Sequence, residues 1–217
     1  MSVTLADANP FLSARTSPDG VARSESGEDP LARLAQEAGR GDRQAMGKLL
    51  HALAPGMLRL IGVVMGAGRA DVDDVAQEAL LSLARSLPRF RGDCRIEWYA
   101  QLLAVRHAIA ARKRRQLDDV RFEDDVGGAE QHGPSPSEEA SSRQRRELLQ
   151  GLLDEIPEPQ AEVLVLRVVL GHSLEETARL VNAPVNTVRS RLRLAREALR
   201  DKILHNRRLA AALEVGP

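Results

Sequence analysis

Residues 173–199 read SLEETARLVNAPVNTVRSRLRLAREAL, and this stretch decides the fold of the C-terminal part of the chain. Ser173 followed by Glu176 is a capping box, in which the hydroxyl and the carboxylate each satisfy a backbone amide that a helix start leaves unpaired. A helix is therefore expected from Ser173 to about Val181. Asn182 then opens a three-residue turn, because asparagine tolerates the left-handed backbone that such turns require. The pattern predicts a helix-turn-helix.

The second helix of this motif is expected from about Val185, with one apolar side and one polar side. Its apolar residues recur at spacings of three and four and are Val188, Leu192, Ala195 and Leu199. Its outward residues are donors suited to bases and phosphates, namely Asn186, Thr187, Arg189, Ser190, Arg193 and Arg196. Recognition helices read base edges with their N-terminal residues, and arginine can chelate guanine, which makes Arg189 the foremost candidate. The same pattern also fits an arginine-rich solvated helix in an ordinary bundle.

The composition favours an all-α protein. The chain has 217 residues, 43% of them hydrophobic and only 2% aromatic, which suits helices better than a β-sandwich or barrel. Its formal net charge is zero, yet basic and acidic blocks alternate along it. The lone Cys94 cannot form an internal disulfide, and the sequence shows no signal peptide and no apolar run of the roughly 20 residues that crossing a bilayer requires. We expect a cytoplasmic protein without membrane insertion.

The chain is expected to form two small helical domains joined by a flexible acidic linker. Residues 1–29 contain too few apolar side chains to offset the entropy of ordering, so this tail is expected to be disordered. Helical periodicity covers 30–115 and returns over 144–204. Between them, 116–143 are rich in Asp, Glu, Gly, Pro and Ser, which is typical of a flexible linker. A short tail follows at 205–217.

A helix expected over 71–87 in the first domain carries an acidic side. Asp74, Gln77 and Glu78 stand at i, i+3 and i+4 and share this side, opposite an apolar stripe. Asp71 lies close enough to contribute. Such a side can bind a basic partner. Taken alone, the pattern is explained more simply by the preference of acidic residues for helix starts.

Two stretches of the chain resemble the extracytoplasmic-function (ECF) sigma factors, a compact group within the sigma-70 family. LEETARLVNAPVNTVRSRLRLAREAL at 174–199, preceded by IPEPQAEVLVLRVVLGHS at 156–173, closely resembles their promoter-binding region four. RADVDDVAQEALLSLARSLPRFRG at 69–92 is similar to region two, with which such factors bind polymerase. The resemblance covers about 31–203. It implies a promoter-specificity subunit that binds bacterial core RNA polymerase and promoter DNA, has no catalytic site, metal or cofactor, and is usually inhibited by an anti-sigma factor.

The resemblance also implies roles for the candidate residues. The outward residues of the second C-terminal helix would read the upstream, or −35, promoter element. The acidic side formed by Asp71, Asp74, Gln77 and Glu78 would bind a coiled coil of the largest polymerase subunit. The loop at 90–95 and the helix that follows would capture a flipped base at the −10 element and help to open the promoter, by stacking on bases and contacting phosphates. The candidates for this step are Arg91, Asp93, Arg95, Trp98, Tyr99, Arg106, Arg112, Lys113 and Arg114.

Several alternatives stay open at this point. Trp98 is explained as well by packing in a core as by stacking on a base. Leu50, Leu53 and Leu58 stand where region two usually has aromatic residues, which affects the expected melting contacts more than the fold. The linker either threads toward the polymerase active centre or acts as a plain tether. Cys94 lacks nearby partners for a zinc site.

Two other classes of protein can be compared with a sigma factor. A stand-alone transcriptional regulator can carry the same helix-turn-helix, but the acidic side at 74–78 argues against it. An enzyme is not supported, because the sequence shows no catalytic triad, glycine-rich phosphate loop or metal cluster. The acidic helix therefore favours a sigma factor over a repressor or an activator.

Overall fold

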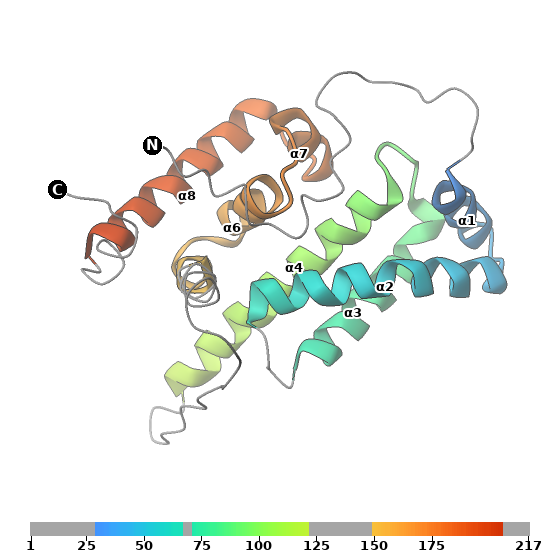
Figure 1. Ribbon diagram of the computed structural model, residues 1–217, viewed down its shortest axis with the longest axis horizontal. Coiled ribbons are helices and arrows are strands. Elements are labelled where there is room, and N and C mark those ends of the chain that lie inside the picture. Colours follow the sequence, from blue (N-terminus) through green and yellow to red (C-terminus); the bar gives the residue numbers. More distant parts are fainter. Residues whose placement is uncertain (1–28, 67–70, 122–148, 206–217) are drawn as a thin grey trace, which may run out of the picture.

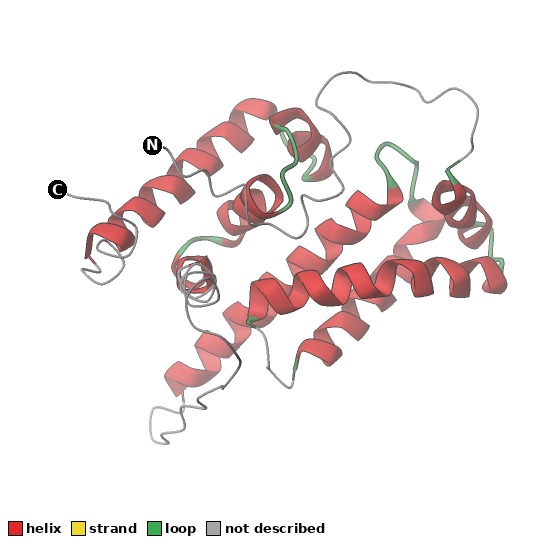
Figure 2. Cartoon of the chain, in the orientation of Figure 1, coloured by secondary structure: helices red, strands yellow, loops and turns green. Residues whose placement is uncertain are grey.

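The computed structural model describes residues 29–66, 71–121 and 149–205, and every regular element in these ranges is a helix (Figure 1, Figure 2). The N-terminal unit contains α1 (Pro30–Gly39), α2 (Arg43–Met65), α3 (Val72–Ser86), the short helix η1 (Leu87–Arg89) and α4 (Ile96–Arg121). The C-terminal unit contains a helical segment at 149–155, α6 (Glu158–Leu164), the π-helical turn η2 (Val165–Val169), α7 (Leu174–Leu180) and α8 (Val185–His205). The expected all-α class is confirmed.

The N-terminal unit is built around α2, which packs against α1, α3 and α4. Asp42 caps the start of α2, because its carboxylate accepts hydrogen bonds from Gln44 N at 2.8 Å and Ala45 N at 3.1 Å. Of the described helices, α2 alone is long and apolar enough, by length and composition, to cross a membrane. Here one side of α2, which includes Leu49 and Leu60, is fully buried among the neighbouring helices, whereas Leu58 on another side is exposed.

The C-terminal unit contains the helix-turn-helix that the sequence predicts. Ser173 and Glu176 form both bonds of the capping box, at 2.7 Å from Ser173 N to Glu176 Oε2 and 3.1 Å from Glu176 N to Ser173 Oγ. Asn182 has a φ of 50° and turns the chain from α7 into α8 through the left-handed region. Val188 and Ala195 of α8 are fully buried. Local signals in the sequence therefore place the cap, the turn and the inward side of this motif correctly.

Helix α4 is longer than the sequence pattern indicates. The pattern predicts a helix end near Arg115, but α4 continues to Arg121, so the first residues of the expected linker are helical. Acidic residues indicate exposure to solvent but do not break a helix, and the first glycine after this point is Gly127. The helix end expected near Arg115 is therefore corrected to Arg121. The rest of the linker and nearly all of the two expected tails lie outside the described residues.

The two units pack against each other along α4. Buried apolar residues from both units form one contiguous cluster, and α4 contacts α6 and α7 as well as the helices of its own unit. Figure 1 shows α6 and α7 on one side of α4 and α3 on the other. The sequence predicts two helical domains and a connection between them. It does not indicate this packing of one unit on the other.

The left-handed residue of the turn provides a test of the fold. Replacing Asn182 with valine should lower the free energy of unfolding by about 1–2 kcal/mol, because a β-branched side chain is strained at positive φ. Replacing Asn182 with glycine, which has no Cβ, should change the stability by less than about 0.5 kcal/mol. Urea unfolding measures both variants. Equal losses in the two would contradict the left-handed turn.

Candidate nucleic-acid interface

Helix α8 presents the residues that the sequence predicts to read DNA. The exposed members of the set are Asn186, Arg189, Ser190, Arg193 and Arg196, and Thr187 is half-buried. Arg189 Nη1 donates to Asn186 Oδ1 at 2.7 Å, so the two side chains are held together near the N-terminal end of α8. This end of the helix offers amide, hydroxyl and guanidinium donors, which is the chemistry that reads base edges in a major groove.

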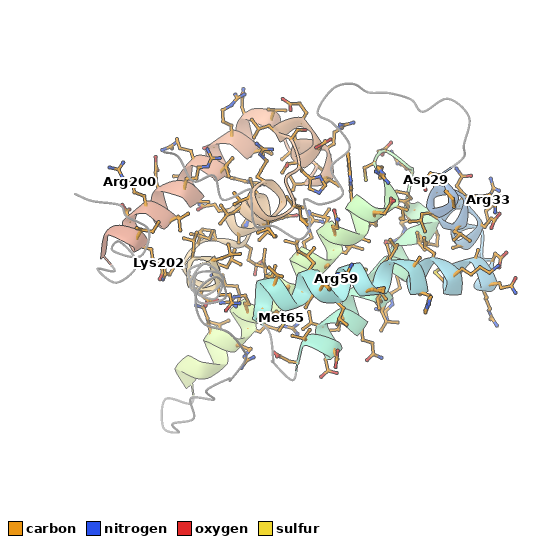
Figure 3. The ribbon with its side chains drawn as sticks, in the orientation of Figure 1. Asp29, Arg33, Arg59, Met65, Arg200 and Lys202 are labelled. Carbon is orange, nitrogen blue, oxygen red and sulfur yellow. The ribbon has the colours of Figure 1, made fainter. Side chains whose placement is uncertain are left out.

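A hollow of about 480 Å³ beside α8 is lined by arginines. Arg189, Arg193, Arg196 and Arg200 belong to α8, and Arg167 comes from the π-helical turn. In Figure 3, Arg200 extends outward from the last turns of α8. Burial lowers the pKa of Arg167, and the nearby Arg196 guanidinium lowers it further. This concentration of positive charge fits a phosphate backbone. Helical spacing does not predict Arg167, because the π-helical turn changes the direction in which its side chain points.

The acidic side of α3 is partly free and partly paired. Asp74 and Gln77 are exposed, whereas Asp71 and Glu78 are ion-paired with the basic end of α4. Arg115 lies 3.1 Å from Asp71, and Arg114 lies 3.4 Å from Glu78. Ion pairs that water can reach contribute little free energy, so a basic partner can replace them. The structure therefore keeps the four predicted residues on one surface that can accept such a partner.

The loop that follows η1 borders an open cleft of about 560 Å³. Phe90, Arg91 and Arg95 line one wall, and Gln36 and Arg40 of α1 line another. Guanidinium and amide groups around a partly apolar wall suit an unstacked base and its phosphates. The contribution of α1 is not predicted from the sequence, because these residues are about fifty positions away from the loop and no local pattern links them.

Tyr99 and Cys94, which lie in the same region, are each constrained by their neighbours. The ring of Tyr99 packs against that of Phe90, with centroids 5.2 Å apart. Burial raises the pKa of the Cys94 thiol and Asp93 raises it further, while Arg179 of α7 opposes the shift. A thiol that stays protonated is a poor nucleophile. Within the described residues, no group of His, Cys, Asp and Glu side chains is placed to hold a metal ion.

The predicted melting residues are divided between solvent and the C-terminal unit. Arg91, Asp93, Arg95, Arg106 and Arg114 are exposed, and Trp98, Tyr99 and Lys113 are half-buried. Arg106 Nε nevertheless pairs with Glu162 of α6 at 2.7 Å. The ring of Trp98 meets that of His172 edge-on, with centroids 5.1 Å apart. The C-terminal unit therefore covers part of the expected melting surface.

Arg112 is the most deeply buried of the predicted DNA-contacting residues, with 5% of its surface exposed. Its guanidinium forms a two-pronged ion pair with Asp154, at 2.8 Å from Nε to Oδ1 and 2.5 Å from Nη2 to Oδ2. It also donates to the carbonyl oxygens of Val64, Met65 and Gln150, at 3.1, 3.1 and 2.8 Å. Figure 3 labels Met65 at the end of α2. The expectation that Arg112 contacts phosphates is corrected for this arrangement, because its hydrogen bonds go to α2 and to the C-terminal unit.

Comparisons with known proteins identify the family. Residues 146–199 match the family described as sigma-70, region 4. The ECF RNA polymerase sigma-E factor of Escherichia coli strain K12 is 31% identical over 178 residues, which cover 78% of this chain and 92% of that protein. The ECF RNA polymerase sigma factor SigD of Mycobacterium bovis is 31% identical over 204 residues, which cover 89% of this chain and 92% of SigD. This chain belongs to the ECF sigma factors.

Two solved structures share the fold of this sigma factor. CnrH, solved in complex with the cytosolic domain of CnrY, aligns with 82% of the chain and 99% of CnrH, at 21% identity and a TM-score of 0.53. The sigma factor RpoE, solved in complex with the anti-sigma factor NepR from Bartonella quintana, aligns with 79% of the chain and 98% of RpoE, at 17% identity and a TM-score of 0.50. At these identities, the structures support the fold alone.

The family match also tells which part of the sigma factor covers α4. Region 4 spans 146–199, so Asp154, Glu162 and His172 belong to it. The stand-alone regulator that a helix-turn-helix by itself would allow is not favoured, since the relatives align far beyond that motif. The protein is an RNA polymerase sigma factor, and its region 4 is packed on the helix expected to act on opened DNA.

His172 lies at the contact between region 4 and α4. It is buried, its Nε2 atom is 3.2 Å from Gln101 Oε1, and its ring meets Trp98. Burial lowers the pKa of His172 and Arg167 lowers it too, while Glu176, 4.0 Å from Nδ1, opposes the shift. The imidazole is therefore held neutral in the packed arrangement.

Acid should weaken the contact between region 4 and α4. When the contact opens, His172 regains a higher pKa and takes up a proton, so the stability of the contact is complete above the ordinary histidine range and falls as the pH drops through it. The fluorescence of Trp98, the one tryptophan of the chain, should report this change between about pH 7.5 and about pH 5. Replacing His172 with glutamine should remove the transition. An unchanged transition in that variant would contradict the assignment.

Proposed function

We propose that this sigma factor divides promoter recognition between its two units. The N-terminal end of α8 reads the −35 element, with Arg189 on a guanine and Asn186 holding the guanidinium in place. The arginine-lined hollow beside α8 binds the flanking phosphates. The observation that carries this proposal is the 2.7 Å bond between Arg189 and Asn186 on the exposed end of a helix-turn-helix. Bidentate arginine contacts to guanine are the commonest specific contacts in the major groove.

The second half of the proposal concerns the −10 element. The cleft between α1 and the loop at 90–95 accepts one unstacked base, with Arg91 and Arg95 beside the strand. Asp93 does not line the cleft but is exposed on the same loop, where it is available to a base amino group. The exposed basic side chains of α4 follow the phosphates. Polymerase supplies the chemistry, and the sigma factor contributes no catalytic residue and no cofactor.

The polymerase-binding surface is the acidic side of α3. Asp74 and Gln77 are free to contact a basic helical surface, and Asp71 and Glu78 join them when their ion pairs with α4 are exchanged. The work takes place in the cytoplasm. Because RpoE was solved with the anti-sigma factor NepR, an anti-sigma factor is also proposed as a partner of this chain.

Replacing Arg189 with alanine should weaken promoter binding by the reconstituted holoenzyme by about 5- to 150-fold, the range for losing one bidentate base contact. Promoters are first identified by transcribing a random promoter library in vitro with bacterial core polymerase and this sigma factor. Binding of the holoenzyme to these promoters is then measured by fluorescence anisotropy. Replacing Arg33 with alanine is the matched control, because Arg33 is an exposed arginine on α1, away from region 4. If Arg189 can be removed without loss of binding, the proposed reading of the −35 element is wrong.

Replacing Asp74 with lysine should weaken binding to core polymerase by at least about tenfold, because the introduced charge repels a basic partner. Replacing Glu37 with lysine makes the same change of charge on α1 and should leave binding unaltered. Both affinities are measured by titrating labelled sigma factor with core polymerase. Equal binding by the two variants would remove α3 from the polymerase interface.

A further inference from the structure

Region 4 contacts four of the α4 residues that the sequence predicts to act on the opened promoter. Trp98 packs against His172, Arg106 pairs with Glu162, Arg112 pairs with Asp154, and Lys113 binds the carbonyl oxygen of Asp154. Two of these contacts join a guanidinium to a carboxylate. Carboxylate and phosphate bind guanidinium groups in the same planar, bidentate manner, so they compete for the same arginines.

We propose that this packed arrangement is a self-inhibited state of the sigma factor, in which Asp154 and Glu162 take the places of nucleic-acid phosphates on α4. The inference rests on the proposed function, because it assumes that α4 contacts the opened promoter strand. A strand reaches the buried Arg112 only after region 4 has moved away, and it binds Arg106 only by displacing Glu162. Packing of region 4 and binding of a strand to α4 therefore exclude each other.

The contact is built so that it can open. Arg106 is 47% exposed in its pair with Glu162, and pairs of this kind are exchanged at little cost. Arg112 is buried, yet it also binds the carbonyl oxygens of Val64 and Met65 in its own unit. These two bonds stay when region 4 leaves, so the guanidinium is not stranded without acceptors. The packed arrangement is favoured over a bound strand because the competing carboxylates belong to the same chain and therefore act at a high effective concentration.

The test compares a variant that weakens the contact with a matched control. Asp154→Asn together with Glu162→Gln removes both negative charges and keeps the shape and the hydrogen-bond acceptors of the side chains. Glu155→Gln together with Glu158→Gln removes two charges from the same helical segments. Glu155 pairs with Lys202 inside the C-terminal unit and Glu158 is exposed, so neither residue crosses to α4. Circular dichroism confirms that each protein is folded.

The separation of the units is followed with two fluorescent labels on the full chain. Leu58 of α2 and Leu194 of α8 are each 39% exposed, so Leu58→Cys and Leu194→Cys provide the two labelling sites. Cys94→Ser removes the free cysteine that would otherwise also be labelled. The contact-weakening variant should show a longer distance between the labels. If at least about nine in ten wild-type molecules are closed, the variant should also bind oligodeoxythymidylate about tenfold or more tightly. The control pair should match wild type in both measurements.

Two outcomes with these variants would overturn the inference. A variant that opens without binding the oligonucleotide more tightly would show that region 4 does not hide a nucleic-acid surface. A variant that stays closed would show that the two carboxylates do not hold the arrangement.

A second measurement uses the labelled protein with Asp154 and Glu162 unchanged. Adding oligodeoxythymidylate should lengthen the distance between the labels in a saturable manner, and so should adding core polymerase. Binding of either one without a change in distance would overturn the self-inhibited state. Failure to bind core polymerase at all would instead contradict the proposed function, so the two failures are distinguishable.

Discussion

A guanidinium that is withdrawn from water must be surrounded by acceptors, and the burial of Arg112 imposes this requirement on both units of the molecule. The end of α2 supplies the carbonyl oxygens of Val64 and Met65, which have no partner within their own helix. Region 4 supplies Gln150 O and the carboxylate of Asp154. Arg112 therefore caps one helix and anchors another at the same time. The packing of region 4 on α4 depends more on these acceptors for the buried guanidinium than on exposed ion pairs such as Arg106–Glu162.

The distribution of charge explains why the two DNA-reading surfaces differ. The basic side chains of α4 have acidic neighbours on two sides, because Asp71 and Glu78 of α3 pair with its end and region 4 pairs with its middle. On α8, Glu197 lies 2.5 Å from Arg193, whereas Arg189 shares a hydrogen bond with the neutral amide of Asn186. A formal net charge of zero thus conceals one open basic surface and one that is occupied.

Sequence reasoning succeeds where the determining interactions are local. The capping box, the left-handed Asn182 and the spacing of Val188 and Ala195 all lie within one stretch of 27 residues, and the structure matches each of them. The burial of Arg112 depends on partners 38 to 48 positions away, which no helical period can reveal. The sequence predicts that Arg112 contacts phosphates, whereas tertiary packing buries its guanidinium against other acceptors. The length of α4 is missed for another reason, because acidic composition suggests a linker although no glycine or proline interrupts the helix before Gly127.

The pairing of Arg112 with Asp154 has a consequence for the exchange of parts between related sigma factors. The two residues lie in different units, so a hybrid that takes region 4 from a relative with an apolar residue at this point would inherit the buried cation without its anion. Leaving a buried charge unpaired in this way costs about 3–5 kcal/mol. Such a hybrid would be driven to separate its two halves or to lose stability. Exchanging region 4 between relatives therefore changes more than promoter preference. A stable hybrid needs matching residues at positions 112 and 154.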